Sequence, residues 1–595
     1  MSNGSSVNGN GNGIKTIKEN IQACMEIYYH LKTTLGPYGR DKLIVDRNNN
    51  YLSTNDGATI LQYLKITHPA ARLLIGISKS QDETVGDGTT SVVLLTCILL
   101  QNTLKFLLLS IHPIIFIKGF QISLDFCLNV INEIKVSPIG DNNNNNNNEE
   151  LLKKEEIFEN EEFLKHLYSV ASTSISSKIL ARYSDHFSKL GVEAVKRLKF
   201  NATQDLIRVI GITGNSMLES QLIDGVLLEI DQNQLSGFKI NDRQQINKEN
   251  EKIKSILKNP SIIIGKLQLN KSCSDQFQGL NLSIPNFYDH NNNNNTNNNN
   301  NNREQMEKIE LLIGFGINIV ISDTEIPAWI ESIFKENNIL YFNIPDSREL
   351  EIISHCINCS LIYDLSSLSS KNINNGQQQQ QQQHPMISKP NSIDIQSIGD
   401  KFFLKISLKG DTSEKSLSLS NGATILLRSP TDTMLQECIR SFKDMLNILS
   451  ATVRNPYLIG GGGCAYIELS KRLRNKANQS IADEKLLISI NCFADSLEMI
   501  PMILIQNAGY DSLDLLGKLK SVHKSSNSSD IWKGVNLNDG TIADMISDLN
   551  VKEPSFLLSN ILTLSSRAAQ MILRINNNIF IEPREQFKIP NHQQS

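Results

Sequence analysis

The 595-residue sequence lacks several features that would indicate particular classes of protein. No Gly-x-x-x-x-Gly-Lys-Ser/Thr stretch occurs, so the common phosphate-binding P-loop is absent. The nine cysteines have no disulfide-like spacing, which fits a reducing cytoplasm better than secretion. The formal net charge is only −4, which gives no electrostatic reason to expect a nucleic-acid partner.

The chain also lacks an uninterrupted apolar run of the roughly 20 residues that a membrane span needs. Its most apolar stretch, residues 92–117, is interrupted by Gln101, Asn102, Lys105, His112 and Pro113. We therefore predict buried helices there, and no membrane span. Residues 1–13 are rich in Ser, Asn and Gly. They contain neither the basic n-region nor the apolar h-region of a signal peptide, so we interpret them as a disordered leader.

The length exceeds what one hydrophobic core usually supports, so the sequence predicts several domains. Tracts of Asn and Gln at 142–148, 291–302 and 377–383 cannot bury enough apolar surface to become ordered, and we expect them to be insertions in surface loops. The two ends of the chain are predicted to be helical, and the middle alternates short β-branched runs with helices. The fold class expected is multi-domain, α and α/β.

The pattern places these elements as follows. Helices are expected at 14–34, 326–336, 433–453, 464–474, 482–506 and 554–573, and others begin near 59 and 90. Strands are expected at 42–46, 51–52, 206–212, 261–264, 317–321 and 339–342.

Three turns near the start of the chain combine glycine with acidic or hydroxyl residues. They are Leu35-Gly36-Pro37-Tyr38-Gly39-Arg40, Asn55-Asp56-Gly57-Ala58-Thr59 and Gly86-Asp87-Gly88-Thr89-Thr90-Ser91. Glycine lets backbone N–H groups approach phosphate oxygens, and a helix N-terminus adds donors and partial positive charge. Aspartate is a hard-oxygen ligand suited to Mg²⁺. Each turn alone is most often only a turn or a helix cap, but three of them together indicate one site for phosphate and Mg²⁺.

The same turns carry a resemblance to a known family. The stretches 35–46, 55–61, 68–71 and 80–92 closely resemble the group II chaperonins, the eukaryotic CCT/TRiC type. Shorter stretches extend the resemblance over nearly the whole chain outside the Asn and Gln tracts: 112–113, 173–178, 220–226, 461–463, 507–511, 534–536 and 553–554.

The resemblance implies three domains. A helical equatorial domain would comprise residues 14–165 and 455–595, and a small intermediate domain residues 166–230 and 398–454. An α/β apical domain would occupy residues 231–397. It also implies an ATPase that couples hydrolysis to the folding or assembly of non-native client proteins, within a ring of homologous subunits in the cytoplasm.

The resemblance further assigns ATP and Mg²⁺ to particular residues. Asp87 would hold Mg²⁺, and Asp56 and Asp444 would polarise the attacking water. Lys178 would sense the γ-phosphate. Phosphate contacts would come from Leu35, Gly36, Pro37, Gly57, Gly88, Thr89, Thr90 and Ser91. Gly462, Gly463, Asp511 and Glu553 would surround the ribose and adenine.

Some residues depart from the family pattern. The apical region matches poorly, Ser429-Pro430 replaces a usual glycine, and Ile439 replaces a usual acidic residue. Two subfamilies remain open, the eta-type ring subunit and the McKusick-Kaufman chaperonin-like type, which we favour slightly. Two other functions also remain open: a nucleotide-binding assembly scaffold outside the ring with little ATP turnover, and a pseudo-chaperonin without ATP binding.

Overall fold

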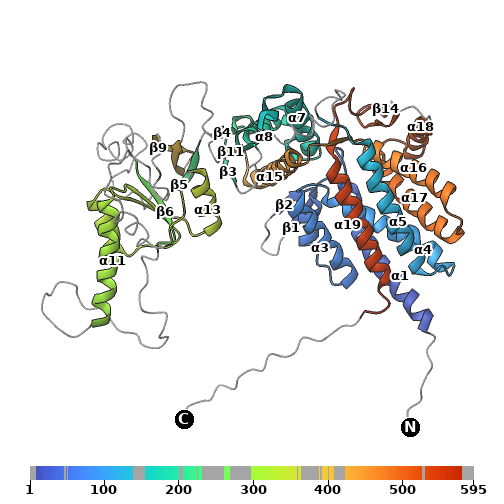
Figure 1. The fold of residues 1–595 in the computed structure, drawn as a ribbon, viewed down its shortest axis with the longest axis horizontal. Coiled ribbons are helices and arrows are strands. Elements are labelled where there is room, and N and C mark those ends of the chain that lie inside the picture. The colour runs from blue at the N-terminus through green and yellow to red at the C-terminus, as the bar shows by residue number, and fades with distance from the viewer. Residues whose placement is uncertain are drawn as a thin grey trace, which may run out of the picture. The chain divides into compact units, whose positions relative to one another are not determined.

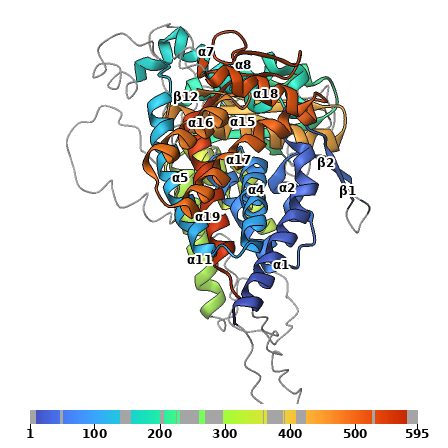
Figure 2. The same ribbon diagram turned by 90° about the vertical axis from the view of Figure 1, so that its right-hand side faces the viewer.

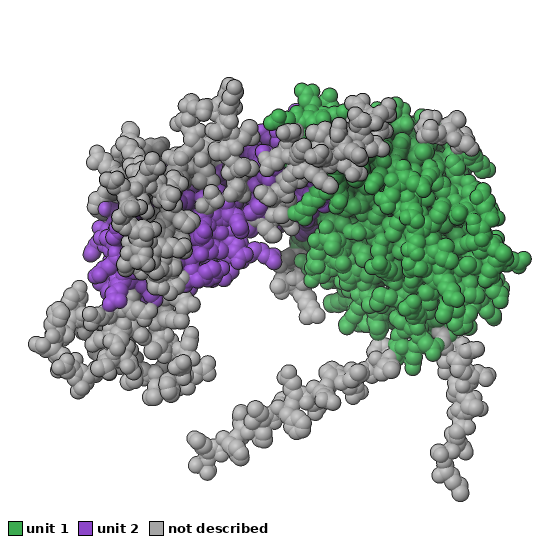
Figure 3. Space-filling view, in the orientation of Figure 1, with its two compact units in different colours: residues 1–184, 454–595 green, residues 185–453 purple. Residues whose placement is uncertain are grey.

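The computed structural model describes the chain in segments. These are residues 9–45, 49, 51–138, 155–199, 206–223, 225–230, 260–267, 296–357, 359–363, 388, 392–399, 401–407, 423–524 and 530–578. The chain divides into two compact units (Figure 3). Unit 1 combines residues 1–184 and 454–595, and unit 2 comprises residues 185–453. Segments from both ends of the chain therefore fold together in unit 1.

Unit 1 is built around long helices that lie side by side (Figures 1 and 2). They are α1 (Gly9–Leu31), α3 (Pro69–Thr84), α4 (Thr89–Leu108), α5 (Pro113–Ile134), α17 (Glu484–Asn507) and α19 (Ser555–Arg574). The helices α17 and α19 each pack against both α4 and α5, and α1 and α3 pack against α4. Within α4 every residue from Val92 to Leu100 is fully buried, which agrees with the buried helix predicted there.

Length and composition alone would allow four of these helices, α4, α5, α17 and α19, to cross a membrane. Between 44% and 67% of each apolar segment is buried in the structure, where α17 and α19 each contact both α4 and α5. Burial of apolar area in this core, worth about 25 cal/mol per Å², is the main stabilising contribution to unit 1.

Shorter elements surround this core. The helices are α2 (Gly57–Tyr63), α7 (Glu161–Ile175), α16 (Cys464–Ser480) and α18 (Ser512–Lys524), with 3₁₀ turns η1 (Lys32–Thr34), η2 (Glu155–Glu159) and η3 (Ile179–Tyr183). The strands are β1 (Lys42–Val45), β2 (Tyr51–Thr54), β12 (Leu458–Gly460), β13 (Lys533–Asn536), β14 (Thr541–Asp544) and β15 (Lys552–Pro554). They form three antiparallel pairs, β1 with β2, β12 with β15, and β13 with β14.

The described residues of unit 2 form three small sheets. Their strand orders are β3-β11-β4, β5-β10-β9 and β6-β7-β8. The strands are β3 (Ile207–Thr213), β4 (Gln221–Ile223), β5 (Val226–Ile230), β6 (Ile262–Gly265), β7 (Ile319–Ser322), β8 (Leu340–Asn343), β9 (Ser392–Ile398), β10 (Lys401–Ser407) and β11 (Ala423–Ser429). Its helices are α8 (Ser184–Leu198), α11 (Thr296–Gly314), α12 (Ala328–Glu336), α13 (Ser347–Cys356) and α15 (Asp432–Arg454), with a 3₁₀ turn η6 (Met217–Glu219).

The third sheet, β6-β7-β8, is parallel and carries the α/β pattern that the sequence predicted. Each of its strands has four residues, and those of β6 and β7 are all buried, which is typical of a parallel sheet covered on both faces. The helix α15 packs on β3, where a Cβ on Gly211 would lie 2.6 Å from Cδ1 of Ile439.

Three features differ from the sequence predictions. The helix α1 begins at Gly9, inside the segment expected to be a disordered leader. The helix α11 begins at Thr296, inside the tract 291–302 expected to be a loop, because a helix that packs through Ile309 and Leu312 can propagate toward its N-terminus one hydrogen bond at a time. The tracts 142–148 and 377–383 lie outside the described residues.

The third difference concerns the antiparallel strands of unit 2. The sequence pattern did not predict β9, β10 or β11. The strands β9 and β10 pair in antiparallel register, with Lys401 opposite Ile398, so these two strands belong to one sheet. The domain boundary expected between residues 397 and 398 stays a prediction.

A buried ion cluster lies between α16, α18 and β13. The Glu468 carboxylate is almost fully buried and accepts a hydrogen bond from Nε of Arg472 at 2.7 Å. Its other oxygen lies 3.0 Å from Nδ1 of His523, whose Nε2 lies 2.8 Å from the carbonyl oxygen of Lys533. Burial alone would raise the pKa of Glu468, but the hydrogen bonds from His523 and Arg472 and the charge of Lys471 outweigh burial and lower the pKa to about 2.

We expect this cluster to make unit 1 sensitive to acid. The unfolded chain binds a proton at Glu468 near the ordinary glutamate pKa, whereas the folded chain does not until about pH 2. The stabilisation from the ionised carboxylate, roughly 2 kcal/mol, is therefore present at neutral pH and is lost as the pH falls from about 5 toward 2. Urea unfolding of the wild type and of Glu468→Gln should show a stability gap that closes over this range.

The matched control is Asp514→Asn, which removes an exposed ion pair with Lys518 on α18. Exposed pairs of this kind contribute about 0–1 kcal/mol, so this variant should stay close to the wild type at every pH. A gap between Glu468→Gln and the wild type that is constant from pH 7 to pH 3 would refute the assignment.

Candidate functional site

The two acidic turns of unit 1 lie against each other at the starts of α2 and α4. Asp56 caps α2, where its carboxylate accepts hydrogen bonds from the N–H groups of Ala58 at 3.3 Å and Thr59 at 2.9 Å. The same carboxylate accepts a hydrogen bond from the hydroxyl of Thr89, 3.1 Å away at the start of α4. A Cβ on Gly57 would lie 2.6 Å from the hydroxyl oxygen of Thr90. The two acidic turns are therefore in direct contact.

Asp87 is the half-buried acidic residue between these turns. Its Oδ1 accepts a hydrogen bond from the N–H of Gly88 at 2.6 Å, and its carbonyl oxygen accepts one from Nε2 of Gln81 at 2.8 Å. Burial raises the pKa of Asp87, and the negative charge of Asp56 raises it further. Lys178 acts in the opposite direction, and so does the Gly88 N–H. The site therefore concentrates negative charge that a cation would stabilise.

Lys178 is brought to this site by the end of α7. It follows Ser177, whose carbonyl oxygen accepts a hydrogen bond from Nδ2 of Asn55. Its positive charge lowers the pKa of both Asp82 and Asp87, although burial and Asp56 raise the pKa of Asp82 by more. Residues predicted from two distant stretches, 55–91 and 173–178, therefore share one electrostatic environment.

Glu553 approaches the same acidic group from β15. It lies opposite Ile459 in the register of β12 and β15. A Cβ on Gly461 would lie 3.2 Å from its Oε1, so the glycine turn and this carboxylate are neighbours. Burial raises the pKa of Glu553 to about 7, and the charge of Asp87 contributes to the increase. This electrostatic coupling connects the C-terminal segment of unit 1 to the acidic turns.

The end of α17 supports both glycine turns. A Cβ on Gly36 would lie 2.4 Å from Cδ2 of Leu504, and a Cβ on Gly463 would lie 2.5 Å from Cβ of Pro501. Both glycines have left-handed backbone angles, with φ of +83° at Gly36 and +79° at Gly463. Nδ2 of Asn507 donates to the carbonyl oxygens of Lys32 and Leu35, at 2.9 and 2.8 Å.

The remaining predicted residues have different surroundings. Pro37 is exposed beside Gly36, and Ser91 lies in the first turn of α4. Gly462, with φ of +59°, lies against Met545 and Val535. Asp511 is exposed and caps α18 by accepting hydrogen bonds from the N–H groups of Leu513 and Asp514, so the described contacts give it a structural role.

Asp444 is a buried residue of α15 in unit 2, and its role in the site stays a prediction.

The sequence reasoning assigned no role to four residues that contribute to this arrangement. They are Asn55, Gln81, Asp82 and Asn507. All four fall within the stretches that carry the family resemblance, but an amide that positions a backbone carbonyl leaves no distinctive spacing in a sequence.

The described residues hold no group of three or more His, Cys, Asp or Glu side chains arranged to bind a metal by themselves. This arrangement differs from a site enclosed entirely by protein ligands. Mg²⁺ commonly takes one or two carboxylates and completes its octahedron with water and phosphate oxygens. The half-buried carboxylate of Asp87 lies within a region of excess negative charge, which fits Mg²⁺ binding through one protein carboxylate.

We predict that Gly463→Ala destabilises unit 1 by about 2 kcal/mol or more, because the left-handed backbone is strained for alanine and Pro501 leaves no space for the Cβ. The matched control is Gly76→Ala in α3, where nothing lies within 4 Å of an added Cβ and alanine favours the helix by about 0.5–1 kcal/mol. Thermal unfolding should separate the two variants. Equal melting temperatures would show that the Gly463 turn does not require glycine.

Comparison with known proteins places this site in a wider context. The profile of the TCP-1/cpn60 chaperonin family matches residues 27–582. The mouse T-complex protein 1 subunit beta is 29% identical over 567 residues, covering 94% of this chain and 92% of the relative. The yeast subunit beta is 30% identical over 560 residues, covering 93% of each chain.

Eta-type relatives match equally well. The T-complex protein 1 subunit eta of Dictyostelium discoideum is 29% identical over 574 residues, covering 96% of this chain and 91% of the relative. Beta and eta subunits are thus similar to this chain to the same degree, so the comparisons do not single out the eta type. The match along almost the full length, together with the glycine and acidic turns assembled in unit 1, shows that the chain belongs to the TCP-1/cpn60 chaperonin family.

Proposed function

We propose that this protein is an ATP-dependent molecular chaperone, a chaperonin subunit that couples ATP hydrolysis to the folding or assembly of non-native client proteins. The observation that carries the proposal is a group of interacting residues in unit 1. The acidic turns of α2 and α4 are joined by a hydrogen bond, and Asp87 interacts electrostatically with Lys178 and Glu553. Family membership supports a chaperone function, and the relatives are named as subunits of T-complex protein 1.

In this proposal the nucleotide lies along the glycine turns. The backbone at Gly36 and Pro37 and the start of α4, with Gly88, Thr89 and Thr90, would contact phosphate oxygens, because these positions offer N–H groups and hydroxyls at a helix N-terminus. The Gly462-Gly463 turn and Glu553 would border the ribose and adenine. Asp87 would hold Mg²⁺, which neutralises phosphate charge when bound.

Hydrolysis requires a water molecule directed at the γ-phosphorus, with cleavage of the bond to the β–γ bridging oxygen. The Asp56 carboxylate is held in place for such a role by the hydrogen bonds that it accepts from the hydroxyls of Thr59 and Thr89. Lys178 would place a positive charge near the γ-phosphate. Asp444 would act as a second carboxylate that orients the water and accepts its proton.

We predict that Asp444→Ala leaves ATP binding intact and lowers turnover by about 10²–10⁴-fold, because a residue that acts on the attacking water contributes to the transition state and little to binding. Asp432→Ala, at the exposed start of the same helix, is the control and should retain full turnover. Binding would be measured by calorimetry and turnover by phosphate release. Undiminished turnover in Asp444→Ala would remove this residue from the mechanism.

We further propose that the chain joins a cytoplasmic ring of homologous subunits. The β1–β2 hairpin supports this proposal, because Leu43, Val45 and Tyr51 share one face of the pair and their side chains are 68%, 53% and 59% exposed. Among the residues that the structure describes, no third strand pairs with β1 or β2, so this sheet has two open edges there. A strand from a neighbouring subunit could pair with such an edge and cover the apolar face.

A charged residue on that face should prevent assembly. We expect Val45→Lys to convert a large ring species into monomers in size-exclusion chromatography with light scattering, while nucleotide binding is retained. Leu513→Lys, which changes an apolar residue on α18 that is even more exposed than Val45, is the control and should still assemble. A wild type that stays monomeric with and without ATP would instead support the alternative of an assembly scaffold acting outside a ring.

A further inference from the structure

One helix, α17, supports both glycine turns of the proposed nucleotide site. Pro501, Leu504 and Asn507 recur at intervals of three along its C-terminal part, so they lie near one side of the helix. Pro501 contacts Gly463, and Leu504 contacts Gly36. Asn507 donates hydrogen bonds to carbonyl oxygens that precede Gly36 in the chain. The relative position of the two turns therefore depends on how this segment of α17 is held.

The segment contains a weak point at Pro501. Proline has no N–H, so the helical hydrogen bond to the carbonyl oxygen of Leu497 cannot form at this position. Helices bend most readily where such a bond is missing. Contacts just before Pro501 must therefore fix the direction in which the last turns of α17 project.

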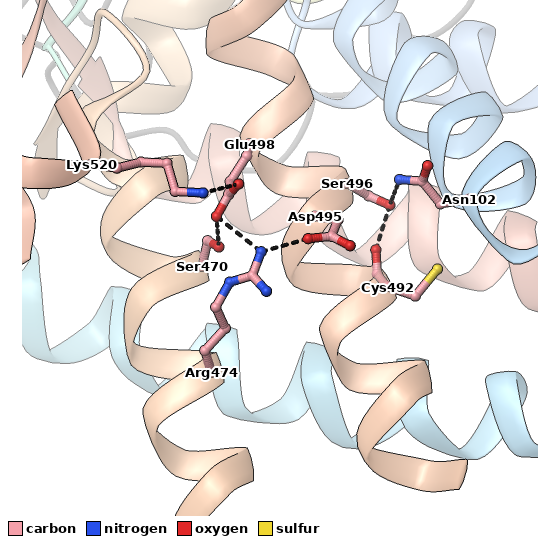
Figure 4. Close-up of polar contacts among 8 residues, drawn as sticks. All are labelled: Asn102, Ser470, Arg474, Cys492, Asp495, Ser496, Glu498 and Lys520. Atoms are coloured by element: carbon pink, nitrogen blue, oxygen red, sulfur yellow. Dashed lines mark hydrogen bonds and ion pairs between the residues drawn. The ribbon is translucent and has the colours of Figure 1, made fainter. Parts of the chain in front are cut away.

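Glu498 provides those contacts from one turn before the proline (Figure 4). Its Oε1 accepts hydrogen bonds from Oγ of Ser470 at 2.7 Å and from Nη2 of Arg474 at 3.0 Å, both on α16. Its Oε2 accepts a hydrogen bond from Nζ of Lys520 on α18 at 2.7 Å. Both oxygens of a buried carboxylate are thus used to join α17 to two neighbouring helices.

The same segment of α17 is also joined to α4. Nδ2 of Asn102 donates to Oγ of Ser496 at 2.9 Å, and this hydroxyl donates to the carbonyl oxygen of Cys492 at 2.8 Å. Arg474 reaches Asp495 at 2.6 Å as well as Glu498. Because α4 begins at the Gly88-Thr89 turn and α16 begins at the Gly463 turn, the network lies between helices that both start at the proposed site.

We propose that Glu498 is a positioning residue for the nucleotide, one that acts through α17 to set the spacing between the Gly36 and Gly463 turns. It lies away from the proposed ligand and would contact neither phosphate nor adenine. This inference rests on the proposed function, since it assumes that a nucleotide bridges the two turns. A ligand that touches both turns would depend on their spacing, whereas a fragment that touches only one would not.

The test compares a bridging ligand with its fragments. Affinities for ADP, adenosine and pyrophosphate would be measured by calorimetry or competition for the wild type and for Glu498→Gln, which keeps the side-chain shape and removes the charge. We expect the Kd for ADP to rise about tenfold, because a small displacement of one turn weakens the contacts at the other. The Kd for adenosine and for pyrophosphate should change by less than about twofold.

A milder variant and a matched control come from α18. Lys520→Met removes one partner of Glu498 and leaves Ser470 and Arg474 in place, so it should raise the Kd for ADP by about threefold. Lys518→Met, two residues away on the same helix, removes only an exposed ion pair with Asp514 and should leave the Kd unchanged. The double variant Glu498→Gln/Lys520→Met should bind ADP about as Glu498→Gln does, because both changes remove the same interaction.

The outcomes separate the two proposals. A wild type that binds no ADP overturns the proposed function, and this inference with it. A wild type that binds ADP with an affinity that Glu498→Gln and Lys520→Met both preserve overturns the role of Glu498 alone. Equal losses for ADP and for both fragments would show a general collapse of the site and would also overturn the positioning role. If Glu498→Gln does not fold, the comparison of Lys520→Met with Lys518→Met decides the question.

Discussion

Half-buried negative charge at the starts of α2 and α4 is the constraint on which the site in unit 1 depends. The negative charges of Asp56 and Asp87 make it less favourable for neighbouring carboxyl groups to ionise. Helix N-terminal N–H groups, hydroxyls and the positive charge of Lys178 offset this effect. Such an arrangement is costly to stability by itself, because like charges in a partly desolvated position repel one another. It becomes favourable when a cation and its phosphate partners enter, which is the chemistry that we propose for it.

The helical core of unit 1 makes this arrangement possible. The acidic turns come from residues 55–91, Lys178 follows α7, and Glu553 lies on β15, so the site draws on segments separated by hundreds of residues. Long apolar helices bring these segments together, and α17 contacts both glycine turns through Pro501 and Leu504. The glycines are required at those contacts because a side chain at Gly36 or Gly463 would overlap Leu504 or Pro501.

Much of this could be predicted from the sequence, and the limits have physical causes. The long helices follow from periodic apolar residues, and the turns at 55–59 and 86–91 follow from glycine and aspartate at helix starts. The strands β9, β10 and β11 were missed, because their pairing depends on partners far away in the chain that no local pattern specifies. The roles of Asn507 and Glu498 were also invisible, since each depends on a contact between helices. The assignment of Asp511 to the ribose or adenine rests on family resemblance, while the described contacts show a helix cap.

The central claim is that Asp87 and its surroundings form a Mg²⁺-dependent ATP site. The most direct measurement is calorimetric titration of the intact protein with ATP, with and without Mg²⁺, for the wild type and for Asp87→Asn. We expect tight binding that depends on Mg²⁺ in the wild type, and loss of that dependence in the variant, because the amide retains the shape and loses the charge that holds the cation. Binding that is indifferent to Mg²⁺ and to Asp87, or no ATP binding by the wild type, would contradict the account.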